Sequence, residues 1–183
     1  MRLYPHTIQD HSLYTGRELT PEQMKALREA ASEMSAKMRA VRIVAASSVS
    51  RRDLEQRLIH KGEDPVQAKK AVAWMEDLDL IDDEKTAEQV VRRCAAKGYG
   101  RNRAKQALYE KRIPKEYWDA VLEDYPDQED AIVDFLRQKL GDNYDDRDVK
   151  RAVDALLRRG HSYSHIRKAL QSLSMETEIQ EDF

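Results

Sequence analysis

The chain has 183 residues and 36% of them are charged, yet 32 lysines and arginines against 34 aspartates and glutamates leave a net charge of only −2. A typical soluble domain is about 25% charged, so this chain carries many charges that nearly cancel. No apolar stretch approaches the roughly 20 residues of a membrane span, and a single cysteine excludes an internal disulfide framework and a cysteine-based zinc site.

Residues 1–20 form the first predicted segment, and they lack a helical period. Apolar side chains such as Ile8, Leu13 and Tyr14 fall at irregular spacings, so we expect a weakly extended or poorly ordered segment. The first residues also lack the apolar region of a secretory signal, which indicates a cytoplasmic protein.

Proline and glycine mark the ends of the helices that we expect from residue 21 onward. Pro21 and Pro65 follow the capping residues Thr20 and Asp64, as at the first position of a helix. The glycines that fall where a helical pattern stops, as a left-handed helix end requires, are Gly62, Gly98, Gly100, Gly141 and Gly160. This punctuation predicts helices of roughly 10–26 residues joined by short turns.

Apolar side chains recur at helical spacing in four segments, which are 68–78, 87–94, 132–140 and 149–156. No part of the chain carries several segments that alternate apolar and polar residues, the pattern of half-buried strands. The sequence therefore predicts an all-α fold.

The chain also contains an internal repeat. Residues 50–58, 100–108 and 162–170 each begin with a small capping residue, followed by an apolar residue four positions later and a leucine after four more. Acidic pairs at 82–83 and 145–146 open the helices that precede the second and third copies. This self-similarity predicts about three tandem three-helix repeats in an elongated molecule. A compact helical bundle with accidental similarity is the alternative.

We expect five parts along the chain, because each unit is small and alanine-rich and must stack on a neighbour to bury its apolar face. They are the N-terminal segment (1–20), a first helical repeat (21–79), a second helical repeat (80–125), a bridging helix with the third repeat (126–175) and an acidic tail (176–183).

These motifs resemble those of the RecX family of recombinase regulators. The matching segments are 50–62 in the first repeat, 80–83, 95–100 and 108–111 in the second, and 156–166 in the third. They occur in the family's order and separation, which is more specific than any one motif alone.

The resemblance covers roughly residues 40–173 and departs from the family pattern at two places. Lys111-Arg112-Ile113 stands where a Lys-Gly-Ile ending is usual, so we expect that helix to end without a glycine cap. His161 stands where an aromatic residue is commoner.

The resemblance implies that the protein binds the RecA recombinase, lies in the groove of the RecA filament on DNA and restrains its assembly. It also implies a role in DNA repair and the SOS response without a catalytic centre. We expect a monomer with no cofactor and no bound metal, and only weak contact with single- or double-stranded DNA.

Charge is segregated along the chain. Residues 92–115 carry +8, residues 116–148 carry −9 and residues 150–168 carry +5. Almost no acid lies within the first segment to pair with its cations, which favours binding to a partner that includes phosphates. The predicted RecA- and DNA-binding residues are Arg92, Arg93, Lys97, Tyr99, Arg101, Arg103, Lys105, Lys111, Arg112, Arg158, Arg159, Tyr163, Arg167 and Lys168.

Each of these residues also has a structural interpretation. Any single cation can belong to a solvated helix face with pairs three or four residues apart. Tyr99, between two glycines, is as well suited to a buried clamp as to an exposed contact. Arg158 and Arg159 would also complement the C-terminal pole of a helix.

No catalytic constellation emerges from the sequence. Gly98-Tyr99-Gly100 is followed by Arg103 at the next fingerprint position, so the dinucleotide-binding pattern fails, and no phosphate-binding loop is present. His161 and His165 are four residues apart but no motif supplies further metal ligands. Cys94 lies on an apolar stripe and is predicted to be a core residue.

Two other functions remain open. A pI near 6.2 argues against a stand-alone nucleic-acid-binding protein, although local basic patches would give weak non-specific binding. A helical adaptor for another protein is equally compatible with the composition.

Overall fold

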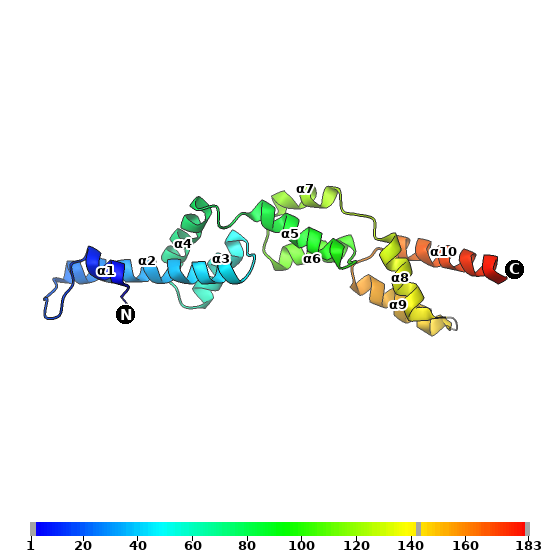
Figure 1. Cartoon of the computed structure of the whole chain (residues 1–183), viewed down its shortest axis with the longest axis horizontal. Coiled ribbons are helices and arrows are strands. Elements are labelled where there is room, and N and C mark those ends of the chain that lie inside the picture. Colours follow the sequence, from blue (N-terminus) through cyan, green and yellow to red (C-terminus); the bar gives the residue numbers. More distant parts are fainter. Residues whose placement is uncertain (1–2, 142–143, 182–183) are drawn as a thin grey trace. The chain divides into compact units, whose positions relative to one another are not determined.

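The computed structural model describes residues 3–141 and 144–181, with side chains described as far as Leu173. Over these residues the chain is helical and contains no strand (Figure 1), so the predicted all-α fold is confirmed. The described helices include none that is both long enough and apolar enough to cross a membrane. The chain divides into two compact units, Met1–Thr86 and Ala87–Phe183.

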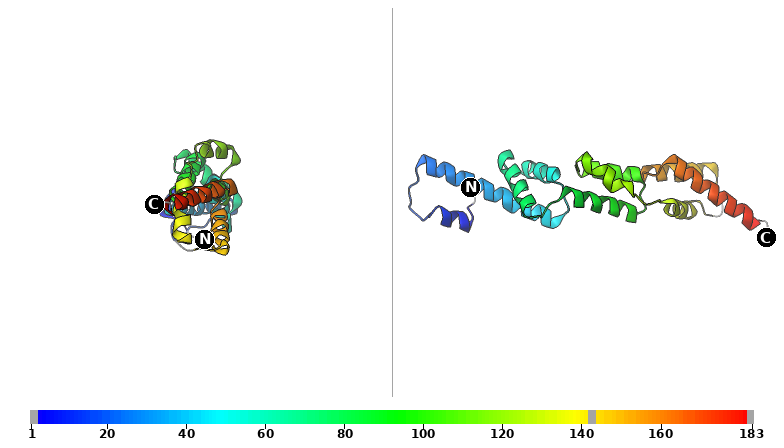
Figure 2. Two further views of the ribbon diagram at one scale, coloured as in Figure 1. Left: turned by 90° about the vertical axis from the view of Figure 1, so that its right-hand side faces the viewer. Right: turned by 90° about the horizontal axis from the view of Figure 1, so that it is seen from above.

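The first unit packs three helices around one hydrophobic core. They are α2 (Pro21–Ala46), α3 (Arg51–His60) and α4 (Pro65–Asp77). α3 and α4 pack against each other and against α2 (Figure 2). Leu54 and Leu58 of α3 are fully buried at the centre of this core, as the leucine spacing of the repeat predicts.

The starts of α2 and α4 are fixed by side chains, as predicted. Thr20 Oγ1 accepts a hydrogen bond from the Gln23 backbone N–H (3.2 Å), and Gln23 Oε1 accepts one from the Thr20 backbone N–H (3.0 Å). Asp64 Oδ1 accepts from the backbone N–H groups of Val66 (2.9 Å) and Gln67 (3.1 Å). These bonds satisfy donors that have no partner within their own helix.

The N-terminal segment contains a short helix, α1 (Pro5–Asp10), where the sequence predicted an extended or poorly ordered chain. α1 packs on α2 and buries Thr7. Beyond its C-terminal end, Arg17 Nη1 donates to the carbonyl oxygens of His11 (2.7 Å) and Ser12 (2.6 Å). A helix of six residues is too short to show an apolar period, so these tertiary contacts, which the sequence pattern does not contain, define it.

The acidic pair at the start of α5 (Asp83–Ala96) serves two different helices. Asp82 caps α5 itself, because its Oδ1 accepts from the Lys85 backbone N–H (3.0 Å). Asp83 instead caps α3: its Oδ1 accepts from the Arg51 backbone N–H (2.8 Å) and its Oδ2 from Arg51 Nε (3.1 Å). The carboxylate of Asp83 is buried, so these charge-assisted bonds hold the start of α5 against α3.

A second hydrophobic core begins the second unit. It lies between α5, α6 (Arg101–Glu110), the short 3₁₀ helix η1 (Lys115–Tyr117) and α7 (Trp118–Glu123). Cys94 is buried in this core, as its place on an apolar stripe predicts.

The helix α6 ends without a glycine, as the sequence predicts. Arg112 follows the helix and takes a φ of 55°, the left-handed conformation that a glycine usually provides.

The third core is formed by α8 (Glu129–Leu140), α9 (Asp146–Arg158) and α10 (Tyr163–Glu181). α8, which the sequence predicts as a bridging helix, packs directly on α9 and α10. The predicted acidic tail (176–183) lies outside the residues whose side chains are described. The five predicted parts of the chain remain a prediction, and the structure adds three hydrophobic cores in chain order.

Within the second unit, the turn between α5 and α6 meets the turn between α9 and α10 backbone to backbone. The Gly100 N–H donates to the carbonyl oxygen of Arg159 (2.9 Å), and the Asn102 N–H donates to that of Gly160 (3.2 Å). These four residues are called the interlocked turns below. The first N–H groups of α6 thus donate to carbonyl groups at the C-terminal end of α9, which have no donor within their own helix. The positive pole of α6 also lies next to the negative pole of α9.

Only glycine fits at the two points of contact. A Cβ on Gly100 would lie 2.1 Å from the Gly160 carbonyl oxygen, and a Cβ on Gly160 would lie 2.2 Å from the Arg103 backbone nitrogen. Gly62, Gly98 and Gly160 have positive φ, as predicted. The same prediction was wrong for Gly100, which has a φ of −72° and is the N-cap of α6. Its small size serves the close approach, and its backbone conformation is one that any residue adopts.

Gly100→Ala tests the interlocked turns without changing charge. Because the added methyl group meets a backbone carbonyl, we expect a loss of about 3 kcal/mol or more in the free energy of unfolding, from overpacking and the lost hydrogen bonds. The control is Gly62→Ala, which has a positive φ but open space around the new Cβ, and should cost only about 1 kcal/mol. Thermal unfolding followed by far-UV circular dichroism measures both. Equal destabilisation by the two substitutions would contradict the close contact.

Candidate functional site

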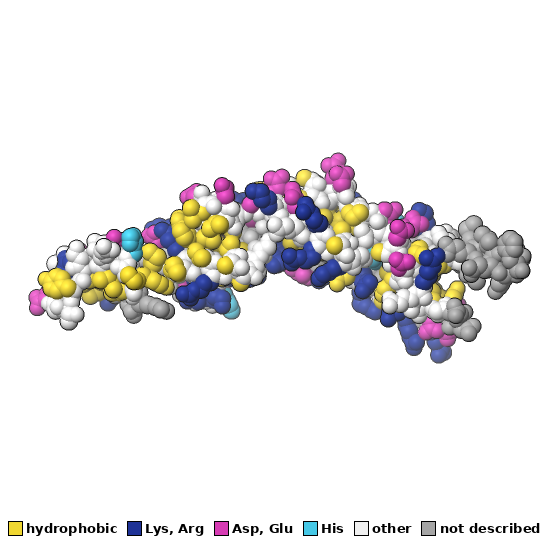
Figure 3. All heavy atoms as spheres, viewed as in Figure 1, with side chains coloured by type: hydrophobic (Ala, Val, Ile, Leu, Met, Phe, Trp, Pro, Cys, Tyr) yellow, Lys and Arg dark blue, Asp and Glu magenta, His cyan; other side chains and the backbone are white. Residues whose placement is uncertain are grey.

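The predicted partner-binding residues lie on six stretches of the second unit: α5, the turn after it, α6, the turn after α6, the end of α9 and α10. Nearly all of their side chains are exposed, and those that are half-buried are Tyr99, Arg103 and Lys111. In the space-filling view, Lys and Arg side chains gather along the lower edge of the region of α6 and α9 (Figure 3). The cationic segments of the sequence therefore lie on the molecular surface.

Acidic side chains neutralise only part of this set. Arg103 Nη1 lies 3.0 Å from Glu110 Oε1, and Lys168 Nζ lies 2.6 Å from Glu129 Oε2. Within the described part of the chain, the predicted cations with no carboxylate within 4.0 Å are Arg92, Arg93, Lys97, Arg101, Lys105, Arg158, Arg159 and Arg167. These two pairs join residues 7 and 39 positions apart, so they are not the pairs three or four residues apart of a self-paired helix face.

Four of the predicted residues line one hollow of about 460 Å³ in the second unit. This basic hollow is lined by Tyr99, Arg103, Phe135, Lys139, Ala155, Arg158 and Arg159. It takes residues from the α5–α6 turn, α6, α8 and the end of α9, so the interlocked turns lie at its side. The predicted residues that do not line it are Arg92, Arg93, Lys97, Arg101, Lys105, Lys111, Arg112, Tyr163, Arg167 and Lys168.

Sequence reasoning missed Phe135 and Lys139. Both belong to the segment 116–148, whose net charge of −9 gives no indication that one of its cations, Lys139, lines the hollow. The signal that identifies them is their spacing, because residues four apart on α8 share one face. The apolar period of residues 132–140 predicts a core face here and gives no indication that Lys139 lies beside Phe135.

The side chain of Arg159 contacts two aromatic rings of the basic hollow. Its guanidinium carbon lies 4.8 Å from the centre of the Phe135 ring and 5.9 Å from that of Tyr99. The distances are those of cation–π contacts. Its backbone carbonyl meanwhile accepts the Gly100 N–H within the interlocked turns. The side chain is thus positioned from both ends.

Tyr99 is held in turn from behind. The Tyr125 hydroxyl donates to the Tyr99 carbonyl oxygen at 2.6 Å, and the ring of Tyr99 packs against the second core. Burial raises the pKa of Tyr125 to about 12, so this hydroxyl stays protonated and remains a donor throughout the physiological range. Tyr99 is therefore a half-buried clamp, and the exposed side of its ring belongs to the hollow.

His161 connects the same two turns and is engaged in structure. Its Nε2 lies 3.1 Å from the Gly98 carbonyl oxygen, so that nitrogen must carry the hydrogen.

The residues that the structure describes contain no group of three or more histidine, cysteine or acidic side chains placed to hold a metal ion. The second core also raises the pKa of the Cys94 thiol through burial, which disfavours the thiolate.

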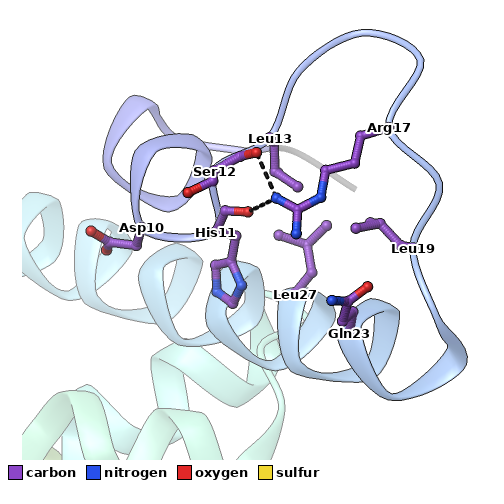
Figure 4. Close-up of a pocket in the computed structure, with 8 residues that line it drawn as sticks. All are labelled: Asp10, His11, Ser12, Leu13, Arg17, Leu19, Gln23 and Leu27. Atoms are coloured by element: carbon purple, nitrogen blue, oxygen red, sulfur yellow. Dashed lines mark hydrogen bonds between the residues drawn. The ribbon is translucent and has the colours of Figure 1, made fainter.

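A second hollow, of about 270 Å³, lies beside α1 and the start of α2 in the first unit (Figure 4). Arg17 points into it together with Leu13, Leu19 and Leu27. The guanidinium is engaged by the two carbonyl oxygens beyond α1, as the dashed lines in Figure 4 show. We therefore assign this hollow a structural role.

The part of the chain that the structure describes is an all-helical protein with a basic hollow on its surface. Comparison with known proteins agrees on this fold class. Residues 82–122 match the family described as RecX, second three-helix domain. Two crystal structures are similar in fold: regulatory protein RecX (TM-score 0.71, 18% identity, 91% of this chain and 86% of the other) and RecX from Lactobacillus salivarius (TM-score 0.66, 21% identity, 80% and 99%).

Sequence relatives narrow the class to one family. Regulatory protein RecX of Halorhodospira halophila is 30% identical over 148 residues, which cover 76% of this chain and 88% of the relative. Regulatory protein RecX of Stenotrophomonas maltophilia is 29% identical over 140 residues, covering 75% and 86%. The chain belongs to the RecX family of regulatory proteins, as its motifs predict.

Because His161 is buried, we expect the folded state to lose stability as the pH falls. Burial lowers the pKa of His161, further helped by Arg159 and His165, and outweighs the opposing effect of its bond to Gly98. The unfolded chain, with an ordinary histidine pKa near 6.5, therefore takes up the proton first as the pH falls. We expect the unfolding midpoint in urea to fall between pH 7.5 and pH 5.5, and to fall less in His161→Gln.

The control for this measurement is His60→Gln, because that side chain is exposed at the end of α3, in the other unit of the chain. It should keep the pH dependence of the unmodified protein. A pH dependence that His161→Gln leaves unchanged would show that other groups cause it.

Proposed function

We propose that the protein binds the RecA filament assembled on DNA and inhibits its recombinase, ATPase and co-protease activities, in DNA repair and the SOS response. The observation that carries the proposal is the 148-residue match to a protein named regulatory protein RecX. The protein acts in the cytoplasm, as a monomer and without a catalytic centre or cofactor of its own. Its contribution is binding energy.

The distribution of unpaired cations supports such a partner. A nucleoprotein filament offers both protein and phosphate, and cations without a carboxylate nearby are available to phosphates in a salt-dependent way. Arg101 and Lys105 on α6 and Arg167 on α10 are exposed cations of this kind. The acidic stretch 116–148 lies between the two cationic stretches and suits basic parts of a protein wall.

Regulation would follow from occupation of the filament. A protein that binds two neighbouring RecA subunits changes the balance between assembly and disassembly only by its difference in affinity for the two states. Inhibition therefore means that the protein binds more tightly to the state that disassembles or does not hydrolyse ATP.

The test is DNA-dependent ATP hydrolysis by RecA from the same organism, measured with increasing amounts of the protein. We expect the rate to fall with the unmodified protein. Reversing charge in Arg101→Glu with Arg103→Glu should raise the half-inhibitory concentration about tenfold or more, the effect of some 1.4 kcal/mol. Far-UV circular dichroism should show unchanged helicity, because Arg101 is exposed and the surface pair of Arg103 with Glu110 contributes little stability.

The matched control is Lys25→Glu with Arg28→Glu, which makes the same change in net charge on the exposed face of α2 in the first unit. It should inhibit like the unmodified protein. Absence of both RecA binding and inhibition in the unmodified protein would refute the proposal. In that case, tight binding to DNA alone would favour a non-specific nucleic-acid-binding protein, and binding to neither would favour an adaptor for another partner.

A further inference from the structure

The basic hollow gathers more positive charge than its surroundings neutralise. Arg103, Lys139, Arg158 and Arg159 all line it, and among the described residues only Arg103 has a carboxylate within 4.0 Å. Like charges in one concave site repel each other and attract a counter-ion. The repulsion destabilises the folded protein when the hollow is empty, and a bound anion would relieve it.

One of these cations is arranged before any ligand arrives. The Arg159 guanidinium lies over the rings of Phe135 and Tyr99 at 4.8 and 5.9 Å, and its carbonyl is bonded to Gly100. A long side chain normally loses rotamer freedom when it binds, which reduces affinity. Since Arg159 is already positioned, a planar fork of donors is available to the two oxygens of a phosphate at little entropic cost.

The lining distinguishes between the anions that would fit. A single carboxylate needs one arginine, whereas four cations that line one hollow would neutralise several phosphates of a polymer. Phe135 and Tyr99 add aromatic side chains to the same hollow, where both are partly exposed. Proteins that bind single-stranded nucleic acid commonly use a basic groove with aromatic side chains, because unpaired bases can stack on the rings.

We infer that the basic hollow binds the phosphodiester backbone of single-stranded DNA directly, with Arg159 as the fixed anchor and Lys139, Arg158 and Arg103 around it. The inference deepens the proposed function and rests on it for its setting, a filament on DNA, but it assigns the DNA contact to named residues of this chain.

The interlocked turns give this site a second property. Tyr99 and Arg103 come from the α5–α6 side of the contact, while Phe135, Lys139 and Arg158 come from α8 and α9. If the turns separate, the two sides of the hollow separate as well. DNA binding and closure of the interlocked turns therefore stabilise each other, as linkage requires.

The experiment measures fluorescence anisotropy of a labelled 20-nucleotide oligo-dT with the full chain, without RecA, over a range of salt concentrations. The test variant is Lys139→Gln with Arg158→Gln, two exposed positions. Loss of two phosphate contacts should lower the salt slope by about 1.4 and weaken binding about 25-fold at 0.1 M salt. Arg147→Gln, an exposed arginine on the same helix as Arg158, should bind within about twofold of the unmodified protein.

Gly100→Ala completes the set, because it removes no charge. It should weaken oligo-dT binding with all four cations in place. Binding by Gly100→Ala equal to that of the unmodified protein would overturn the link to the interlocked turns. No binding by the unmodified protein at low salt, or equal binding by the double variant and Arg147→Gln, would overturn the assignment of the site.

RecA ATP hydrolysis measured in parallel separates this inference from the proposed function. If the double variant binds oligo-dT normally but no longer inhibits RecA, the hollow contacts an acidic protein surface and the DNA assignment is wrong. If it loses oligo-dT binding in the predicted way, the assignment holds whether or not inhibition persists. Absence of inhibition by the unmodified protein would refute the proposed function alone.

Discussion

The second unit depends on one contact, in which the start of α6 meets the end of α9. Helix α6 begins at Gly100, which has no side chain to cap it, and its first N–H groups need acceptors from elsewhere. The carbonyls of Arg159 and Gly160 provide them, and opposite poles of two helices come together. This is possible only because two glycines allow backbone to touch backbone. The contact joins the helices of the second core to those of the third.

The basic hollow follows from that contact. Arg159 belongs to both, since its carbonyl accepts the Gly100 N–H while its guanidinium lies over Phe135 and Tyr99. His161, two residues after Arg159, adds a hydrogen bond from its Nε2 to the Gly98 carbonyl oxygen. The contact between the turns and the inferred DNA site therefore share the same short stretch of chain. A RecX family protein that acts by occupation needs such a surface to be rigid, because a mobile one would lose binding energy in ordering itself.

Local features were predictable from the sequence, because their causes are local. Thr20 and Asp64 cap the helices that follow them, and the repeated leucine spacing led to Leu54 and Leu58 in the first core. Contacts between distant segments were not predictable in this way. Asp83 caps α3 across 32 positions of sequence, and Lys139 joins the candidate site although it belongs to an acidic stretch. The net charge of a segment sums residues on all faces of a helix, whereas a binding site is formed by the residues on one face.

Amide hydrogen exchange at Gly100 and Asn102, resolved by NMR in the free protein, tests the central claim most directly. The first amides of a helix normally have no acceptor and exchange fast. The interlocked turns predict that both are protected, and that their exchange requires the opening that also exposes the core amides of α6. Fast exchange at these two amides, with the rest of α6 protected, would contradict the contact on which the hollow and the proposed DNA site depend.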